Sequence, residues 1–577
     1  PAGNGLADPW SGAASQPVYP WRGRITCDPA PGRPGSPQGA PAAATQVNNF
    51  FSGGSWNYRN MILHYASLVA SAGGVHAFMI GSELRSLTRV RSGSGVYPAV
   101  NALTALAADV KSIVGSSTIV TYGADWTEYG ADVVTPDASE VRFPLDSLWA
   151  SSAIDVVGID YYAPLADWRD EAGHLDSSNA ASTYDVGYLA GNVYSGEGFD
   201  WYYADDAARA VQDRTPITDG LGKPWTFRVK DIRSWWSSAH HERISGVELA
   251  SPTAWLPQGK PIWFTEIGCG AVDKGANQPS AFADPKSVEN TRPFFSSGAP
   301  DALMQRQYLR AHLAHWNDPA TNPDGMVDAA RIYPWAWDAR PFPAFPQRLD
   351  AWGDGGNYAT GHWLTGRLGA AASDEVLAAI AADYGIELAG ADARGPLIHG
   401  LVVEGMVPAR DAMAPVLAAA GLGTHDEVEG LGFSRVSTRG TLTVARDDLA
   451  AGDAPLAARR RPDPTEEIGT LALGYVDRDR DYLAGTVTAM RLSGGIATAE
   501  NARLVLDAAG ARRTAERLLG DRAAGRDGLE LALPPSAAAL EVGDALTLSE
   551  APDGPYEVTG IRNGAVRRVS ARAIPPV

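Results

Sequence analysis

The feature that most constrains this fold is a run of five short apolar segments, separated by helical or polar stretches. Helical periodicity occurs at residues 57–72, 100–114 and 306–316, with a shorter helical piece at 143–151. Short buried strands that alternate with helices are typical of a parallel sheet with crossover connections. The predicted strands are VHAFMIGSE (75–83), STIVTYGADW (117–126), IDVVGIDYY (154–162), PIWFTEIG (261–268) and ARIYPWAWD (330–338).

A closed barrel of this kind needs eight parallel strands, and five are visible. We therefore predict an α/β fold, a (β/α)8 TIM barrel over residues 1–365 whose first three strands lie upstream of this chain. An open, doubly wound parallel sheet is the alternative. The Pro- and Gly-rich residues 1–45 are predicted to form a loop. A long polar insertion at 165–255 is expected to carry helices near 204–212 and 230–238.

The second half of the chain has a different pattern. Residues 366–460 combine amphipathic helices at 373–386 and 406–422 with short extended segments, which predicts an α+β module. Residues 461–577 consist mostly of strand patterns, interrupted by one predicted helix at 499–523. We therefore expect two mixed, β-rich modules to follow the barrel.

Composition excludes several classes of function. The net charge of −19 argues against specific nucleic-acid binding, because phosphate contacts need clustered Lys and Arg. Two cysteines, Cys27 and Cys269, form neither a disulfide framework nor a zinc pattern. No apolar run is long enough for a membrane span. Without a metal or phosphate-binding motif, we predict no metal and no cofactor.

Two of the predicted strands end in glutamate, Glu83 and Glu266. In a parallel barrel the carboxyl ends of all strands open onto one face, where active sites lie. Glutamate is a poor strand residue and is costly to bury without a partner. Glycoside hydrolysis requires such a pair, one carboxylic acid to protonate the leaving oxygen and one carboxylate as nucleophile or base.

Aromatic residues also follow the strand ends. Trp126 follows one strand, Tyr161 and Tyr162 end another, and Trp335 and Trp337 end the last. Aromatic faces at a barrel mouth can stack on the apolar faces of sugar rings. Each tryptophan taken alone is better explained as a core residue than as a ligand platform, so only the set supports a sugar-binding cleft.

The strand motifs MIGSELRSLT, TYGADWTEYG, IDVVGIDYYAPL, PIWFTEIGCG and YPWAWD resemble the last five strands of β-mannanase-like glycoside hydrolases. More narrowly, they resemble the TIM-barrel domain of the large tail-tip or baseplate protein of gene transfer agents and related tailed phages. The resemblance covers residues 1–365. The segments LVVEGMVPARDAMAPVLAAAG, LGYVDRDRDYLAGTV and LELALPPSAAALEVGDALTLSE resemble the tail-hub domain that follows this barrel.

The resemblance implies a role for each matching residue. Glu83 matches the general acid/base and Glu266 the nucleophile, while Tyr162 matches a tyrosine that hydrogen-bonds the nucleophile. Ser82 is also expected to contact substrate. Most of the wider clan has Asn at this position, which leaves the preference at the sugar 2-position open. The remaining matches are substrate contacts, namely Asp125, Trp126, Trp335 and Trp337.

Two functions of different classes follow from the resemblance. The first is a tail-tip hub component that binds or cleaves host cell-wall or surface glycan by a retaining mechanism. The second is a purely structural hub or receptor-binding scaffold with a non-catalytic barrel. Both imply a protein made in the bacterial cytoplasm and built into the virion tail tip. Its expected partners are other baseplate proteins, in a homotrimeric ring whose channel lets DNA pass.

Overall fold

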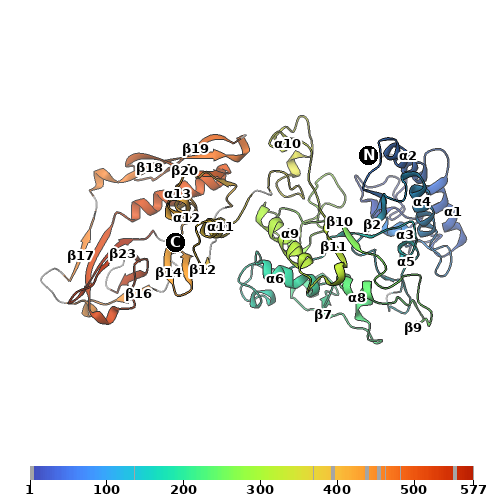
Figure 1. Ribbon diagram of the computed structural model, residues 1–577, viewed down its shortest axis with the longest axis horizontal. Coiled ribbons are helices and arrows are strands. Elements are labelled where there is room, and N and C mark those ends of the chain that lie inside the picture. The colour runs from blue at the N-terminus through green and yellow to red at the C-terminus, as the bar shows by residue number, and fades with distance from the viewer. Residues whose placement is uncertain are drawn as a thin grey trace. The chain divides into compact units, whose positions relative to one another are not determined.

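The computed structural model describes residues 6–135, 137–367, 370–391, 397–435, 441–450, 456–461, 463–480, 482–549 and 555–575. The chain forms two compact units (Figure 1). The first contains residues 1–340 and 344–365, and the second contains 341–343 and 366–577. Within the described residues, no helix is both long and apolar enough to cross a membrane.

The first unit is built on a five-stranded parallel sheet. Its strands lie side by side in chain order, and every neighbouring pair is parallel. A doubly wound sheet reverses its strand order at one point, and these five strands show no reversal. They are β1 (Ala77–Ser82), β2 (Ile119–Asp125), β5 (Val157–Tyr161), β10 (Ile262–Ile267) and β11 (Val327–Pro334).

The sheet is most deeply buried at its centre, and side chains beside its two edge strands are in contact. All five residues of β5 are buried, whereas β1 and β11 are only partly so. Arg331 Nη2, within β11, lies 3.3 Å from Nε2 of His76, the residue before β1. The side chain of Trp263 on β10 stacks on His76 and lies under Arg331. Side chains from the segments of the first and last strands therefore contact each other.

Helices cover the sheet and bury its apolar side chains. In Figure 1, α1, α2 and α4 lie together near β2, and they pack on one another. The loop predicted for residues 1–45 is wrong at its end, because α1 begins at Pro41, where the fixed proline φ favours a first helical turn. The helices are α1 (Pro41–Ser52), α2 (Tyr58–Ser71), α3 (Arg85–Thr88), α4 (Pro98–Val114), α5 (Asp146–Trp149), α9 (Ala302–Asn317) and α10 (Ala344–Gln347).

The insertion after β5 folds into short helices and two-residue strands. Two of them, α7 and α8, lie within the helices expected near 204–212 and 230–238. Its elements are α6 (Val186–Gly191), β6 (Trp201–Tyr202), α7 (Asp206–Ala210), β7 (Thr215–Pro216), α8 (Ile232–Ser237), β8 (Arg243–Ile244) and β9 (Val247–Glu248). β8 and β9 extend a small sheet with β3 (Asp132–Val133) and β4 (Val141–Arg142), which ties the insertion to the segment after β2.

The described residues of the second unit form three further sheets and three α-helices. The strand orders are β12-β15-β14, β13-β20-β18-β19 and β16-β22-β23-β24-β21-β17. The helices are α11 (Ser373–Asp383), α12 (Ala409–Ala420) and α13 (Ala508–Ala524). The strands are β12 (Leu388–Ala391), β13 (Gly400–Leu401), β14 (Gly423–Glu427), β15 (Gly430–Ser434), β16 (Thr441–Val444), β17 (Ala457–Arg460), β18 (Ile468–Asp477), β19 (Leu483–Met490), β20 (Ile496–Leu506), β21 (Gly528–Leu533), β22 (Ala545–Leu548), β23 (Tyr556–Arg562) and β24 (Arg567–Ala573).

Two features of this unit differ from the sequence-based reading. The helix predicted at 499–523 is wrong in its first third, because residues 496–506 form β20 and pair in parallel with β18. The helix starts only at Ala508, where the Asp507 side chain caps it by accepting from Gly510 N. Strand pairing also crosses the predicted boundary at residue 460, since β16 and β17 join the sheet of β21–β24.

Candidate active site

Glu83 follows β1 in an unusual backbone conformation. Its φ is +51°, a region that residues other than glycine rarely occupy. Its backbone N–H donates to Gly123 O at 2.8 Å, and the next N–H, of Leu84, donates to Tyr122 Oη at 2.6 Å. Both contacts anchor the turn to the neighbouring strand β2. The residue is only 8% exposed, so the turn holds the carboxyl inside the unit.

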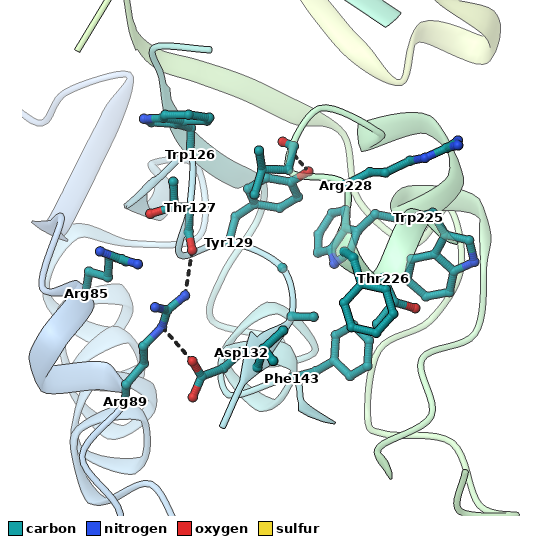
Figure 2. A pocket seen from close by; sticks show the side chains of 16 residues that line it. Arg85, Arg89, Trp126, Thr127, Tyr129, Asp132, Phe143, Trp225, Thr226 and Arg228 are labelled. Atoms are coloured by element: carbon teal, nitrogen blue, oxygen red, sulfur yellow. Dashed lines mark hydrogen bonds and ion pairs between the residues drawn. The ribbon is translucent and has the colours of Figure 1, made fainter. Parts of the chain in front are cut away.

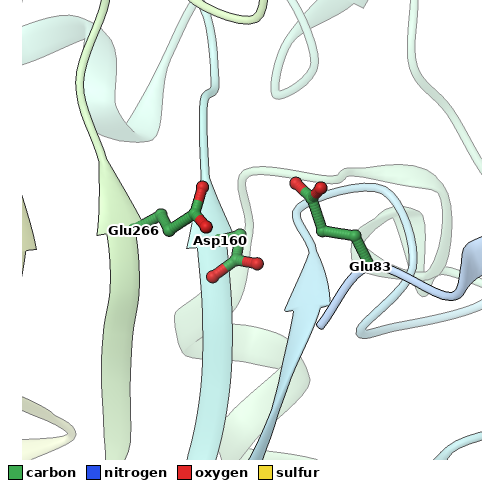
Figure 3. Close-up of side chains that lie close together, drawn as sticks. All are labelled: Glu83, Asp160 and Glu266. Atoms are coloured by element: carbon green, nitrogen blue, oxygen red, sulfur yellow. The ribbon is translucent and has the colours of Figure 1, made fainter. Parts of the chain in front are cut away.

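Glu266 lies in β10, two strands further across the sheet than β2. Tyr162, the residue after β5, donates its hydroxyl to Glu266 Oε2 at 2.8 Å. One oxygen each of Glu83, Asp160 and Glu266 lies within 4.8 Å of the other two. Figure 3 shows the three carboxyl groups side by side, with Asp160 between the glutamates. The structure thus brings the predicted pair together.

Asp160, on β5, is a third carboxyl that the sequence analysis missed. It is fully buried and accepts two hydrogen bonds of 2.6 Å, from Ser82 Oγ and from Thr265 Oγ1. The hydroxyl of Ser82, predicted to contact substrate, is therefore already engaged. A signal was present in the sequence, because the acidic residue of GIDYY interrupts an apolar strand just as the two glutamates do.

The N-terminal loop supplies two more side chains that had not been predicted. Trp21 Nε1 donates to Glu83 Oε2 at 2.6 Å. Arg22 Nη2 lies 3.1 Å from Glu83 Oε2 and 3.4 Å from Glu266 Oε1, and also donates to Ser82 Oγ. Gly23 permits this arrangement, because a Cβ there would lie 2.4 Å from the Trp21 ring. One positive charge therefore bridges both glutamates.

Burial dominates the ionisation of the three carboxyls. It raises the pKa of Glu83 to about 7, against the Trp21 hydrogen bond and with help from the Asp160 charge. Burial and the charge of Glu266 raise the pKa of Asp160 to about 7. The pKa of Glu266 is also raised by burial, although the Tyr162 hydrogen bond opposes this. The cluster consequently retains protons near neutral pH and titrates as a coupled set.

In the part of the chain that the structure describes, no hydrogen bond or ion pair joins the remaining predicted residues to the two glutamates. Asp125 ends β2 and accepts from Thr127 N at 2.9 Å and from the Thr127 hydroxyl, so its carboxylate stabilises its own turn. Trp126 is partly buried against the core. Trp335 and Trp337 follow β11 with 44% and 70% exposure. They are thus available to a ligand beside the cluster.

The three carboxylates have oxygens close enough to hold a cation. However, the Arg22 guanidinium already lies against two of them and supplies a positive charge. The arrangement suits proton transfer better than metal binding. A protonated and an ionised carboxyl on facing sides of a small gap form an acid/base or acid/nucleophile pair.

The fold and site therefore define an α/β unit with paired carboxyls at the carboxyl ends of parallel strands. The model of the GTA TIM-barrel-like domain matches residues 56–346, and that of a putative phage tail protein matches 408–561. The chain belongs to the family of the GTA TIM-barrel-like domain, where GTA stands for gene transfer agent. With the second match, the chain is a tail component of a phage-like virion, as the sequence motifs predicted.

Solved structures show more limited likeness. A chain from the virion of a native gene transfer agent particle is 29% identical, with a TM-score of 0.35, over 39% of this chain and 52% of that one. The present chain thus spans about half the length of that protein. The 43 kDa tail protein of prophage MuSo2 from Shewanella oneidensis is 14% identical, with a TM-score of 0.27, over 36% and 66% of the two chains. No curated protein matches the chain.

Proposed function

We propose that the first unit is a glycoside hydrolase domain that cleaves host cell-wall or surface glycan by a retaining mechanism. The observation that carries this proposal is the short gap between Glu83 and Glu266, which have oxygens within 4.8 Å. Retaining enzymes place their carboxyls about 5–5.5 Å apart, whereas inverting enzymes need about 6.5–9.5 Å for an intervening water. The observed spacing supports direct attack by one carboxylate.

The contacts of each glutamate suggest its role in the first step. Ionised Glu266, oriented by the Tyr162 hydroxyl, attacks the anomeric carbon while the bond to the leaving oxygen breaks. Glu83 gives its proton to that oxygen. Because Trp21 donates to Glu83 Oε2, the other oxygen, Oε1, is left to carry the proton. The products are a glycosyl ester on Glu266 and a shortened glycan.

The second step returns the enzyme to its starting state. Glu83, now ionised, removes a proton from water as the water oxygen attacks the anomeric carbon and the ester bond to Glu266 breaks. The pKa of about 7 suits Glu83 to both steps, because near neutral pH it can donate and then accept a proton. Arg22 compensates charge on both carboxylates throughout.

The second unit supports a place for this domain in a tail hub. We propose that the chain assembles with other tail-tip or baseplate proteins in a homotrimeric ring whose channel lets DNA pass. The match of residues 408–561 to a phage tail protein family supports a structural role for this unit. The barrel-like unit would then act on glycan at the host surface.

Paired substitutions test the catalytic proposal. Glu83→Gln and Glu266→Gln in the whole chain should each abolish release of reducing ends from purified peptidoglycan or host surface polysaccharide. Glu171→Gln, at an exposed position of the same unit, serves as the matched control and should leave cleavage intact. If cleavage by the two site variants equals that of the unsubstituted protein, the proposal is wrong.

A structural or receptor-binding scaffold is the second candidate. It is favoured by Arg22, which lies against both glutamates at the position where a substrate has to approach. Under this alternative, Arg22 is a permanent ion-pair partner that holds the two strand ends together. Arg22→Ala should then lower the melting temperature without producing any glycan cleavage, whereas the hydrolase proposal requires cleavage by the unsubstituted chain.

A further inference from the structure

The first unit contains a cavity of about 380 Å³, a size typical of small-ligand sites. Three segments form it, the one that follows β1, the one that follows β2, and residues 225–235 of the insertion. Figure 2 shows side chains from all three segments around one space. The first two segments directly continue the strands that end in Glu83 and Asp125. The cavity thus extends the same face of the sheet.

Three arginines line this cavity, and their partners differ. Arg89 is neutralised by Asp132 at 3.2 Å and donates to Thr127 O (Figure 2). Arg228 pairs with Asp231 at 3.5 Å. Arg85 has no hydrogen-bond or ion-pair partner for its guanidinium among the described residues, and its Nε is buried. Among the described residues, Arg85 is therefore the arginine of this cavity whose guanidinium has no direct partner.

The surroundings of Arg85 make an anion favourable there. The residue is partly buried, and burial together with the neighbouring Arg89 lowers its pKa. A guanidinium removed from water is stabilised by charge-assisted hydrogen bonds, and its planar fork matches a carboxylate in a bidentate arrangement. The charges of Asp125, Glu128 and Asp132 act on Arg85 from nearby and raise its pKa. Among the described residues none of the three forms an ion pair with Arg85, and Asp132 pairs with Arg89 instead.

The other walls are aromatic and suit a sugar ring. Figure 2 shows Trp126 on one side and Trp225 and Phe143 on the other. Tyr129 and Trp235 also line the cavity, packed edge to face with ring centroids 5.0 Å apart. Aromatic faces can cover the apolar C–H face of a pyranose while its hydroxyls stay in water.

Charge links the cavity to the carboxyl cluster. Arg85 is two residues from Glu83, and the Asp125 carboxylate interacts electrostatically with both of them. A glycan whose scissile bond lies at Glu83 could therefore place a neighbouring unit against Trp126 and Arg85. An acidic group on that unit would meet the Arg85 guanidinium, which has no hydrogen-bond or ion-pair partner among the described residues.

We propose that this cavity is a subsite for a sugar unit that carries a carboxylate, so that the glycan bound by this chain is acidic. This inference rests on the proposed function only for placing a glycan at the site, and it does not require turnover. A carboxylate-bearing pyranose can be a uronic acid of a surface polysaccharide or the lactyl-bearing amino sugar of the cell wall. The test separates these sources.

Binding of monosaccharides tests the proposal, because a free sugar has no glycosidic bond to cleave. Affinities of the whole chain for glucuronic acid, N-acetylmuramic acid, glucose and the methyl ester of glucuronic acid can be measured by ligand-observed NMR titration. We expect at least one of the two acids to bind about tenfold or more tightly than glucose and the ester, as for a hydrogen bond to a charged group. Tighter binding of glucuronic acid identifies the surface polysaccharide, and tighter binding of N-acetylmuramic acid identifies the cell wall.

Variants locate the preference. Arg85→Gln should abolish it and Arg85→Lys should retain part of it, while Arg348→Gln, at an exposed arginine of the same unit, should leave it unchanged. Equal binding of acid and ester by the unsubstituted chain would overturn the inference without using any variant, and so would a preference that survives in Arg85→Gln. If the chain cleaves neutral glycan but binds the acids no more tightly than glucose, this inference alone is refuted. If the chain prefers the acids but cleaves no glycan, only the hydrolase proposal is refuted.

Discussion

Trp21→Phe tests whether the N-terminal loop controls the ionisation of Glu83. The indole N–H donates to Glu83 Oε2 at 2.6 Å, and this bond stabilises the ionised carboxylate. A hydrogen bond to a charged group contributes about 1.5–3 kcal/mol, and about 1.4 kcal/mol corresponds to one pH unit. Removing the donor should therefore raise the pKa of Glu83 by about one to two pH units, from about 7.

The pKa can be followed by carbon-13 NMR of protein labelled at the glutamate carboxyl carbon, with Glu83→Gln to assign the resonance. Trp10→Phe is the matched control, because that indole donates to a backbone carbonyl, of Arg24, and not to a carboxylate. Gly23→Ala should act like Trp21→Phe, since its Cβ would displace the Trp21 ring. An unchanged or lowered pKa of Glu83 in Trp21→Phe would refute the reasoning. It would mean that water enters the space of the indole and donates to the Glu83 carboxylate in its place.

Three further outcomes follow from the buried polar groups. Tyr162→Phe removes the hydroxyl that donates to Glu266, so the pKa of Glu266 should rise. The acid limb of the pH–activity profile should then move to higher pH, and kcat/KM at pH 6 should fall by about tenfold or more. The pKa of Asp160 is raised to about 7, so the stability that its protonated form contributes is lost as pH rises through 7. The free energy of unfolding, measured with urea, should therefore decline between pH 4 and 7. In Asp160→Asn this decline should be smaller. Lys230 is fully buried, donates to two backbone carbonyls at 2.7 and 2.6 Å, and has its pKa lowered to about 7. The stability that neutral Lys230 contributes is lost as pH falls from about 10 to 7. The free energy of unfolding of Lys230→Met should therefore decline less over that range than that of the unsubstituted protein. An equal decline in the two proteins would contradict this assignment.

The parallel sheet could be predicted because its signals are local. Each strand is a short apolar run bounded by polar residues, and Glu83 and Glu266 stand out because they end such runs. The same logic applied to Asp160 would have completed the carboxyl cluster. Carboxyls in apolar strands are thus a signal that sequence alone provides.

The contacts of the N-terminal loop could not be predicted in this way. Trp21 is 62 residues from Glu83, and Arg22 is 244 residues from Glu266, in a segment without helical or strand periodicity. Similarly, residues 499–506 have helix-compatible composition but form part of a strand, because pairing with β18 and burial of Leu504 and Leu506 determine their conformation. Long-range partners of this kind leave no trace in local sequence.

The six-stranded sheet of the second unit has a consequence for synthesis on the ribosome. β16 pairs with β22, and Thr443 meets Thr547 across 104 residues of chain. At about 5–20 residues per second, β16 waits roughly 5–20 s for its partner to be made. During that interval β18, β19, β20 and α13 emerge and can pack on one another, since they occupy the intervening sequence. The nascent chain thus exposes the pairing edge of β16 throughout that interval, and a holding chaperone could protect it until β22 emerges.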